Sequence, residues 1–276
     1  MTLNYVKSYV PTREDSLSLQ SDLSELSQWC LDNDMVLNIN KCKHVRFGRK
    51  VRTYETCYFL GGSPLTKCDT ISDLGITFDT KLTFVPHIDS ISNKASKMLG
   101  FVMRNTKKFK HPRTKITLYC AYVRSVLEYG SVIWAPHYTV HQLRLERLQK
   151  RFLRYLSYSC YEFGKLASYK HKLKLYKMHS LIDRRHVHDM IFLFKVLRGQ
   201  IDCPTLLRLF HFRVPSHLPR RPLGLLSAPA ARTNLKQNYT VSRLCKNFNA
   251  LCIFVDIFND NLTVFKTAVF DQVSNI

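Results

Sequence analysis

The spacing of hydrophobic residues changes near Pro86, and this change limits the folds open to the chain. Before it, apolar and polar residues tend to alternate, as in Met35, Leu37 and Ile39, which is typical of half-buried strands. After it, apolar residues recur every three or four positions, which is typical of amphipathic helices. The alternating or β-rich stretches are Met35–Ile39, Val45–Phe47, Tyr54–Leu60 and Ile71–Phe78. The sequence therefore predicts the α+β class, with a small antiparallel sheet over about residues 35–79 and a mostly helical remainder.

Six groups of apolar residues have helical spacing. The group closest to the N-terminus, from Leu19 to Cys30, predicts a helix over residues 16–31. A capping box from Thr12 to Asp15 precedes this helix, and Trp29 is expected to widen its buried face. A helix that includes Leu197 is expected to stop at Gly199. The groups are Leu19, Leu23, Leu26 and Cys30; Ile88, Ile91, Ala95, Met98, Leu99 and Val102; Ile116, Tyr119, Cys120, Val123, Val126 and Leu127; Leu145, Leu148, Phe152 and Leu156; Val187, Met190, Ile191, Phe194 and Leu197; and Val241, Leu244, Phe248, Leu251 and Val255.

The charge of the chain is strongly positive and unevenly distributed. It has 42 Lys and Arg against 20 Asp and Glu, a net charge of +22, which makes polyanions and above all nucleic acid the expected partners. Residues 1–36 are acidic at −4, residues 37–86 hold +4, and residues 87–154 and 155–276 hold +11 each. A basic connector with four prolines is predicted over residues 213–236.

The cysteines and the hydropathy indicate the compartment. The nine cysteines are scattered and form no C-x-x-C pair, which argues against a disulfide framework and favours a reducing environment. No basic-then-apolar leader is recognisable, and no run reaches the roughly 18 apolar residues of a membrane span. We expect a cytoplasmic or nuclear protein that is not secreted and has no membrane partner.

Short motifs follow one another in a fixed order from about residue 14 to residue 156. The first block is Asp22-Leu23, Trp29-Cys30, Leu37-Asn38-Ile39-Asn40-Lys41-Cys42 and Phe47. The second block is Ser72-Asp73-Leu74-Gly75-Ile76, Phe84, His87-Ile88, Lys94-Ala95, Leu99-Gly100-Phe101 and Arg104. The third block is Leu118-Tyr119, Val123-Arg124-Ser125, Leu127-Glu128-Tyr129, Trp134, Pro136, Leu148-Gln149 and Arg151-Phe152-Leu153. In this order and spacing, the blocks resemble the C-terminal part of the reverse transcriptases of jockey-like non-LTR (LINE-type) retrotransposons.

The resemblance implies a domain organisation. Residues 1–85 would be the end of a polymerase palm, with motif D-like and primer-grip-like segments, and residues 86–157 the helical thumb. Residues 158–276 would be a helical C-terminal region, in which the likeness is looser. The small antiparallel sheet is then the remnant of the palm.

The resemblance also implies a function, but this sequence departs from the family's catalytic motif. Members of the family are RNA-directed DNA polymerases, in which paired aspartates upstream of the first helix hold Mg²⁺. Asn4 and Tyr5 stand at the corresponding positions here, and neither can replace a carboxylate that binds Mg²⁺. We therefore expect a fragment of a transposable element with no catalytic residue, metal site, cofactor or small-molecule substrate of its own. Whether it is an enzyme stays open, and no activity is expected of the isolated chain.

The predicted function is to hold RNA and DNA, as template and primer, through backbone contacts. Arg144, Arg147, Arg151 and Arg154 recur at helical spacing and would form a stripe roughly 15 Å long on one helix face. By resemblance, Lys41 would lie near the phosphates of an incoming nucleotide, and Gly75 would allow the turn of the primer grip. The predicted nucleic-acid-binding residues are Lys41, Gly75, Lys94, Lys97, Arg104, Arg124, Arg144, Arg147, Lys150, Arg151 and Arg154.

Other interpretations of these residues remain open. Lys41 fits a solvent-exposed lysine at a strand end, Gly75 an ordinary hairpin turn, and the arginine stripe a solvated surface. The histidines lack the partners of a zinc site. The whole chain also fits a basic helical protein expressed by a host from a degenerate insertion and acting through protein contacts, or a remnant that does not fold stably.

Overall fold

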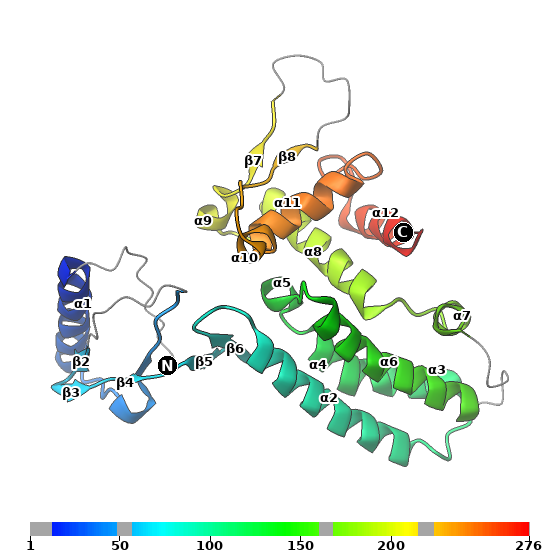
Figure 1. Cartoon of the computed structure of the whole chain (residues 1–276), viewed down its shortest axis with the longest axis horizontal. Coiled ribbons are helices and arrows are strands. Elements are labelled where there is room, and N and C mark those ends of the chain that lie inside the picture. The colour runs from blue at the N-terminus through cyan, green and yellow to red at the C-terminus, as the bar shows by residue number, and fades with distance from the viewer. Residues whose placement is uncertain (1–12, 49–56, 160–167, 215–223, 276) are drawn as a thin grey trace. The chain divides into compact units, whose positions relative to one another are not determined.

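A computed structural model describes residues 13–48, 57–159, 168–214 and 224–275 (Figure 1). Asn4, Tyr5, Thr12, Cys160 and residues 54–56 of the predicted strand at 54–60 lie outside the described residues, and the rest of that stretch is a strand only at Phe59–Leu60. The chain divides into two compact units, Met1–His87 and Ile88–Ile276. It contains both helices and several small sheets, as the α+β prediction requires.

In its described residues, 13–48 and 57–87, the first unit contains one long helix and three short strand pairs. Helix α1 (Arg13–Asp32) packs against β2 (Phe59–Leu60), where the Gln20 side chain donates to the carbonyl of Phe59 at 2.9 Å and accepts from its N–H at 2.8 Å. Strand β2 pairs antiparallel with β3 (Ser63–Pro64). Strand β1 (Lys43–His44) pairs in parallel with β4 (Thr66–Lys67), and β5 (Thr70–Asp73) pairs antiparallel with β6 (Ile76–Asp79).

The predicted single antiparallel sheet over residues 35–79 is therefore wrong. The described strands form separate two-stranded pairs, and one of them is parallel. The strand expected at Met35–Ile39 is absent, and a 3₁₀ turn, η1 (Ile39–Lys41), stands at its end. The carbonyl of Asn38 accepts hydrogen bonds from the N–H of Lys41 and the thiol of Cys42. Such local hydrogen bonds compete with strand pairing, which explains why the alternating pattern at residues 35–39 does not form a strand.

The first helix was predicted correctly, but the expected role of Trp29 was wrong. It spans Arg13–Asp32 and buries Cys30 as expected. Trp29 does not widen the buried face, because 52% of it is exposed. Leu19, Leu23 and Leu26 are half-buried. This side of the first unit is therefore only partly covered within the part of the chain that the structure describes.

The second unit is helical, and its first part contains the three helical stretches that the second, third and fourth apolar groups predict. Helix α2 (Val85–Asn105) begins at the end of the first unit, and α3 (Pro112–Tyr119) leads through a π-helical turn, η2 (Cys120–Arg124), into α4 (Ser125–Glu128). The short α5 (Ser131–Trp134) precedes the long α6 (Thr139–Ser159). The residues Ile88, Leu99, Tyr119, Leu127, Leu145, Phe152 and Leu156 are almost fully buried, as their spacing predicts.

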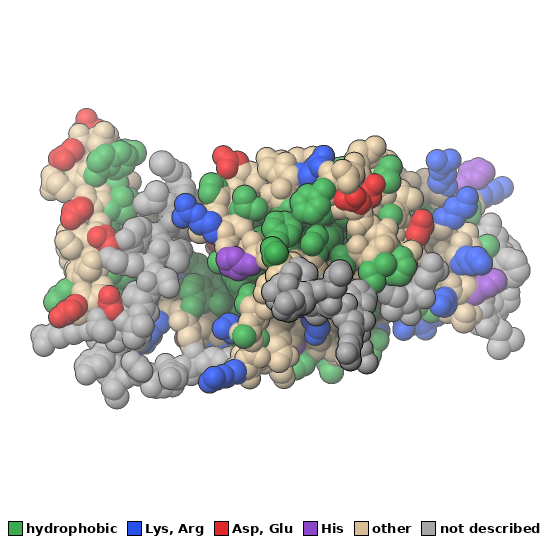
Figure 2. Space-filling view, turned by 90° about the horizontal axis from the view of Figure 1, so that it is seen from above, with side chains coloured by type: hydrophobic (Ala, Val, Ile, Leu, Met, Phe, Trp, Pro, Cys, Tyr) green, Lys and Arg blue, Asp and Glu red, His purple; other side chains and the backbone are tan. Residues whose placement is uncertain are grey.

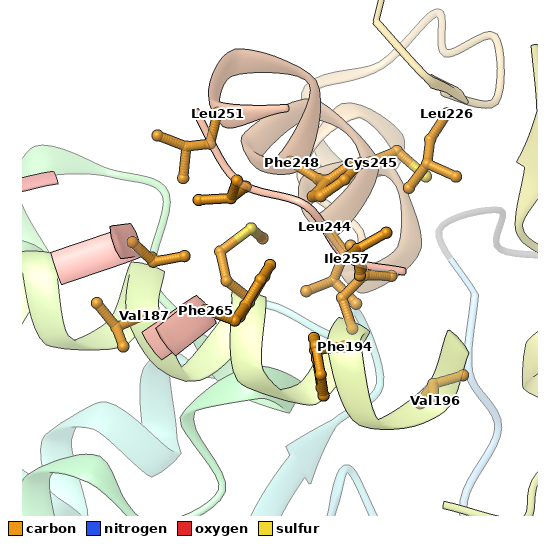
Figure 3. Close-up of a cluster of buried hydrophobic side chains, with 14 of the residues drawn as sticks. Val187, Phe194, Val196, Leu226, Leu244, Cys245, Phe248, Leu251, Ile257 and Phe265 are labelled. Carbon is orange, nitrogen blue, oxygen red and sulfur yellow. The ribbon is translucent and has the colours of Figure 1, made fainter. Parts of the chain in front are cut away.

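The C-terminal region contains six helices in the part that the structure describes, and three of them form most of the main hydrophobic core (Figure 3). The helices are α7 (Tyr169–Leu175), α8 (Leu181–Leu197), α9 (Pro204–Leu207), α10 (Asn234–Gln237), α11 (Thr240–Leu251) and α12 (Leu262–Asn275). Phe194 of α8, Phe248 of α11 and Phe265 of α12 meet in this core. Helix α8 ends where predicted, since Gly199 has φ +66° and the N–H of Gln200 bonds back to the carbonyl of Lys195.

Two predictions for this region need correction. Helix α11 ends at Leu251, short of Val255, which is buried in the turn that follows. The stretch 213–236 is not simply an extended connector, because β8 (Leu226–Ser227) pairs antiparallel with β7 (His211–Phe212) and α10 follows. Pro215, Pro219 and Pro222 lie outside the described residues. None of the described helices is long and apolar enough to cross a membrane.

Candidate nucleic-acid interface

Helix α6 has one apolar face and one cationic face. Leu145, Phe152 and Leu156 are fully buried along its inner side. Arg147, Arg151 and Arg154 are exposed on its outer side, three or four residues apart, and therefore follow one another along the helix. The predicted stripe thus exists as a row of three exposed guanidinium groups.

Helix α2, which runs next to α6, also carries exposed cations. The hydroxyl groups of Thr106, which directly follows α2, and Tyr155 on α6 are 2.9 Å apart, and an ion pair joins the two helices near their other ends, so they run side by side (Figure 1). The exposed lysines and arginine of α2 are Lys94, Lys97 and Arg104. We call these three residues together with Arg147, Arg151 and Arg154 the α2–α6 basic face.

The three carboxylates among residues 87–154 are each engaged elsewhere. Asp89 pairs with Arg144, Glu128 accepts two hydrogen bonds from the guanidinium of Arg184, and Glu146 is buried. Within the described part of the chain, no carboxylate forms an ion pair with the cations of the α2–α6 basic face. Its positive charge is therefore available to an external anion.

Arg144, the first arginine of the predicted stripe, has different surroundings. Its Nη1 bonds to a carboxylate oxygen of Asp89 on α2. Both side chains are about two-fifths exposed, at 39% for Arg144 and 46% for Asp89. Its charge is partly neutralised within the fold, so we leave Arg144 out of the α2–α6 basic face.

Arg124 and Lys150 are also less available than the sequence suggests. Arg124 is half-buried, with its Nε 3.8 Å from a carboxylate oxygen of Glu128. Lys150 is half-buried, and its ammonium lies 5.0 Å from the ring centroid of Tyr169 in a cation–π arrangement. Arg124 thus pairs along its own helical run, and Lys150 contacts the neighbouring helix α7, roles that charge counting along the sequence does not reveal.

Lys41 and Gly75 belong to the first unit. Lys41 is exposed at the end of η1, which is a 3₁₀ turn and not a strand end. Leu74 and Gly75 have φ values of +44° and +80° and form the two-residue turn between β5 and β6. Positive φ at both positions is typical of a type I′ hairpin, for which glycine is favoured. The structure does not position these two residues relative to the α2–α6 basic face.

Four further cations lie next to the face and were not among the predicted site residues. Lys107, Lys108, Lys110 and Arg113 are exposed in the connection between α2 and α3 and at the start of α3. The run Lys107-Lys108-Phe109-Lys110 was the available signal. It was counted in the charge of residues 87–154 but not assigned to a site.

A buried polar network holds the inner side of α6. Both carboxylate oxygens of Glu146 accept from the N–H of Leu181, at 3.2 and 3.1 Å, and Oε1 also accepts from the Tyr169 hydroxyl. The Gln149 amide donates to that hydroxyl and to the carbonyl of His179, both at 2.9 Å, and accepts from Tyr119 at 3.1 Å. Burial raises the pKa of Glu146, which these hydrogen bonds partly offset. The network orients α6 so that its arginines point outward.

Among the described residues, no group of three or more His, Cys, Asp and Glu side chains is arranged to hold a metal ion. The carboxylate of Asp79, one of the few acids near the primer-grip-like segment, has a structural role. It accepts from the hydroxyl of Thr83 at 3.0 Å and from the N–H of Phe84 at 2.7 Å. These bonds fix the turn between β6 and α2.

Comparison with known proteins gives no assignment: no protein-family model and no curated protein matches the sequence, and no solved structure matches the fold.

Proposed function

We propose that the chain binds the sugar–phosphate backbone of nucleic acid through the α2–α6 basic face. The observation that supports this most is the row Arg147, Arg151 and Arg154, which is exposed and unpaired within the described residues, while every acid of residues 87–154 is engaged elsewhere. Guanidinium groups suit phosphate oxygens because their planar N–H donors bind two oxygens at once. Contacts of this kind give affinity and orientation without reading sequence.

A salt titration of the full chain on an RNA–DNA hybrid tests the proposal. Each phosphate neutralised releases counterions, so the logarithm of the binding constant should fall linearly with the logarithm of the salt concentration. The triple variant Arg147→Gln, Arg151→Gln and Arg154→Gln should flatten that slope by roughly two to three units, since a slope of roughly −0.9 accompanies each phosphate contact on duplex DNA. Glutamine preserves helix propensity, so helical circular dichroism should not change.

Arg144→Gln and Lys266→Gln provide matched controls. Arg144 belongs to the same helix but already pairs with Asp89, and the exposed Lys266 lies on α12, outside the face. Both should change the slope less than any one of the three exposed arginines. Equal slopes for the triple variant and the parent chain would show that the row is a solvated surface, and the proposal would fail.

We further propose that the chain is the C-terminal part of a jockey-like retrotransposon reverse transcriptase and holds template and primer in that context. The support for this is the order and spacing of the three motif blocks between about residues 14 and 156. Because Asn4 and Tyr5 replace the family's paired aspartates, the isolated chain should not extend a primer with Mg²⁺ or Mn²⁺. Extension above background that disappears on Asp73→Asn would contradict this proposal, because it would reveal a metal site at a residue assigned here to strand β5.

A further inference from the structure

Three exposed phenylalanine rings lie close to one another in the C-terminal part of the second unit. Phe212 belongs to β7, and Phe254 and Phe258 follow α11; their exposed fractions are 46%, 57% and 47%. The ring centroids of Phe212 and Phe258 are 5.7 Å apart, with the planes tilted by 44°. Exposed aromatic rings that cluster in this way mark an interaction surface. Figure 2 looks down on the side of the molecule with the β7–β8 hairpin and shows hydrophobic side chains gathered there.

An open cavity adjoins two of these rings. Phe254 and Phe258 line it together with Leu225 and Ile253, and its volume is about 470 Å³, which lies within the range of small-ligand pockets. Asp256 also lines the cavity, but its carboxylate accepts from the N–H groups of Phe258 and Asn259 at 2.8 and 3.1 Å. That carboxylate therefore stabilises the turn. Asp260 lines the cavity as well, and its carboxylate accepts from the N–H of Asp256 at 3.2 Å. The two phenylalanine rings offer faces on which a flat aromatic guest such as a nucleobase can stack.

Three exposed arginines lie in the same part of the chain as the rings, and one of them contacts a ring-bearing residue. Arg198 donates to the backbone carbonyl of Phe258, and Arg213 directly follows Phe212, with its N–H bonded to the carbonyl of Leu225 at 2.8 Å. Arg208 lies on the chain between them, just before β7. In the described part of the chain, none of the three forms an ion pair with a carboxylate. Residues 195–232 contain seven Lys and Arg and one acidic residue, Asp202.

We propose that this surface, which we call the aromatic face (Phe212, Phe254 and Phe258 with Arg198, Arg208 and Arg213), binds single-stranded nucleic acid. Bases would stack on the rings, and the backbone phosphates would contact the arginines. Rings beside cations favour a nucleic-acid strand over an apolar protein segment, because a single strand presents both an aromatic plane and a negative charge at every nucleotide. Stacking of this kind is tolerant of sequence, since every base has a π-face. The inference goes beyond the α2–α6 basic face and does not depend on it.

Binding of the full chain to fluorescein-labelled 20-nucleotide oligo(dT), followed by fluorescence anisotropy, tests the inference. The triple variant Phe212→Leu, Phe254→Leu and Phe258→Leu keeps an apolar surface but removes the rings. Its dissociation constant should rise at least about fivefold, the loss expected when one stacked base is removed. The salt slope should stay the same, because stacking releases no counterions. Affinity for a duplex should change much less.

Two further variants keep the result interpretable. Phe254→Leu alone changes the most exposed ring and covers the case in which the triple variant does not fold; it should weaken oligo(dT) binding at least about twofold. The double variant Tyr122→Leu and Tyr239→Leu removes exposed rings elsewhere and should leave binding unchanged.

Unchanged oligo(dT) affinity in a folded ring variant, or no oligo(dT) binding by the parent chain, would overturn the inference and point to a protein partner for this surface. Ring-dependent oligo(dT) binding together with a duplex salt slope that is insensitive to Arg147, Arg151 and Arg154 would uphold the aromatic face while the α2–α6 proposal fails.

Discussion

The arginines on α6 and those on α8 and α11 have the same chemistry but opposite surroundings. Arg147, Arg151 and Arg154 are exposed on α6 and pair with no carboxylate among the described residues. Arg184 on α8 binds Glu128 through two nitrogens, and Arg243 on α11 binds the buried Asp189 with Nε 2.8 Å from the carboxylate. A net charge of +22 therefore combines two populations: cations that hold helices together and cations that remain available to a ligand.

Arg243 should give the largest effect in this comparison. Its guanidinium bonds to Asp189 and to the carbonyl of Val132, so it ties α11 to α8 and α5. Arg243→Ala would leave Asp189, which is 1% exposed, without its cation, and breaking a buried pair in this way costs about 3–5 kcal/mol of the free energy of unfolding. Urea denaturation followed by circular dichroism measures the loss.

A double variant serves as the control for this prediction. Asp189→Leu with Arg243→Met removes both charges and should recover much of the lost stability, because no unpaired buried charge remains. If Arg243→Ala lowered the free energy of unfolding by less than about 1 kcal/mol, Arg243 would behave like a solvated arginine. The distinction between arginines that hold helices together and arginines that are available to a ligand would then fail.

Glu128→Gln should produce the next largest effect. Glu128 accepts from the Nη2 of Arg184 at 2.9 Å and lies 3.8 Å from the Nε of Arg124, and it is largely shielded from solvent. Removing the negative charge leaves two arginines facing a neutral amide, so the free energy of unfolding should fall by about 1.5–3 kcal/mol, the range for hydrogen bonds to charged groups. The same denaturation experiment applies. If Glu128→Gln were as stable as the parent chain, Arg184 would not be held by this pair.

The two units also differ in how far the sequence predicted them. Helices α2, α6 and α8 were predicted because their apolar residues recur at helical spacing over many turns, and Gly199 marked an end. The strand pairs of the first unit are only two to four residues long, too short for a period of two to be distinguished from chance. Local hydrogen bonds to the carbonyl of Asn38 decided the outcome at Ile39–Lys41.

Helix α12 was not predicted, although its signal was present. In α12, Leu262, Phe265, Val269 and Val273 follow at i, i+3, i+7 and i+11, and all but Leu262 are buried. The short helices α5, α9 and α10 have four residues each, too few to show a period. Their positions depend on contacts with α8 and α11, which the sequence alone does not reveal.

For the candidate site, the spacing of Arg147, Arg151 and Arg154 was sufficient to predict a shared helix face. The sequence did not reveal the partner of Arg144, because Asp89 is 55 residues away along the chain. Nor did it reveal that Phe212 and Phe258 would meet, because their contact depends on how β7 and the turn after α11 pack. Local geometry follows from local sequence, whereas availability to a ligand depends on distant partners.

Arg144→Gln tests the intermediate case between paired and free arginines. The Arg144–Asp89 pair is about two-fifths exposed, and pairs of this kind stabilise proteins by about 0–1 kcal/mol because solvent screens them. The free energy of unfolding should therefore fall by at most about 1 kcal/mol, and the difference from the parent chain should shrink at high salt. A larger loss that persists at high salt would place Arg144 with Arg184 and Arg243.

The smallest effect on stability is expected from the three exposed arginines. Arg147→Gln, Arg151→Gln and Arg154→Gln remove cations that pair with no carboxylate in the described residues, and surface substitutions of this kind usually change the free energy of unfolding by at most about 0.5 kcal/mol each. Removing like charges three or four residues apart also relieves repulsion along α6, so at low salt the triple variant should be as stable as the parent chain or slightly more stable. Urea denaturation at low and high salt measures both effects. A loss above about 2 kcal/mol for the triple variant would mean that these arginines hold the fold together, and the weakened nucleic-acid binding of that variant would then no longer support a role of α6 in contacting phosphates.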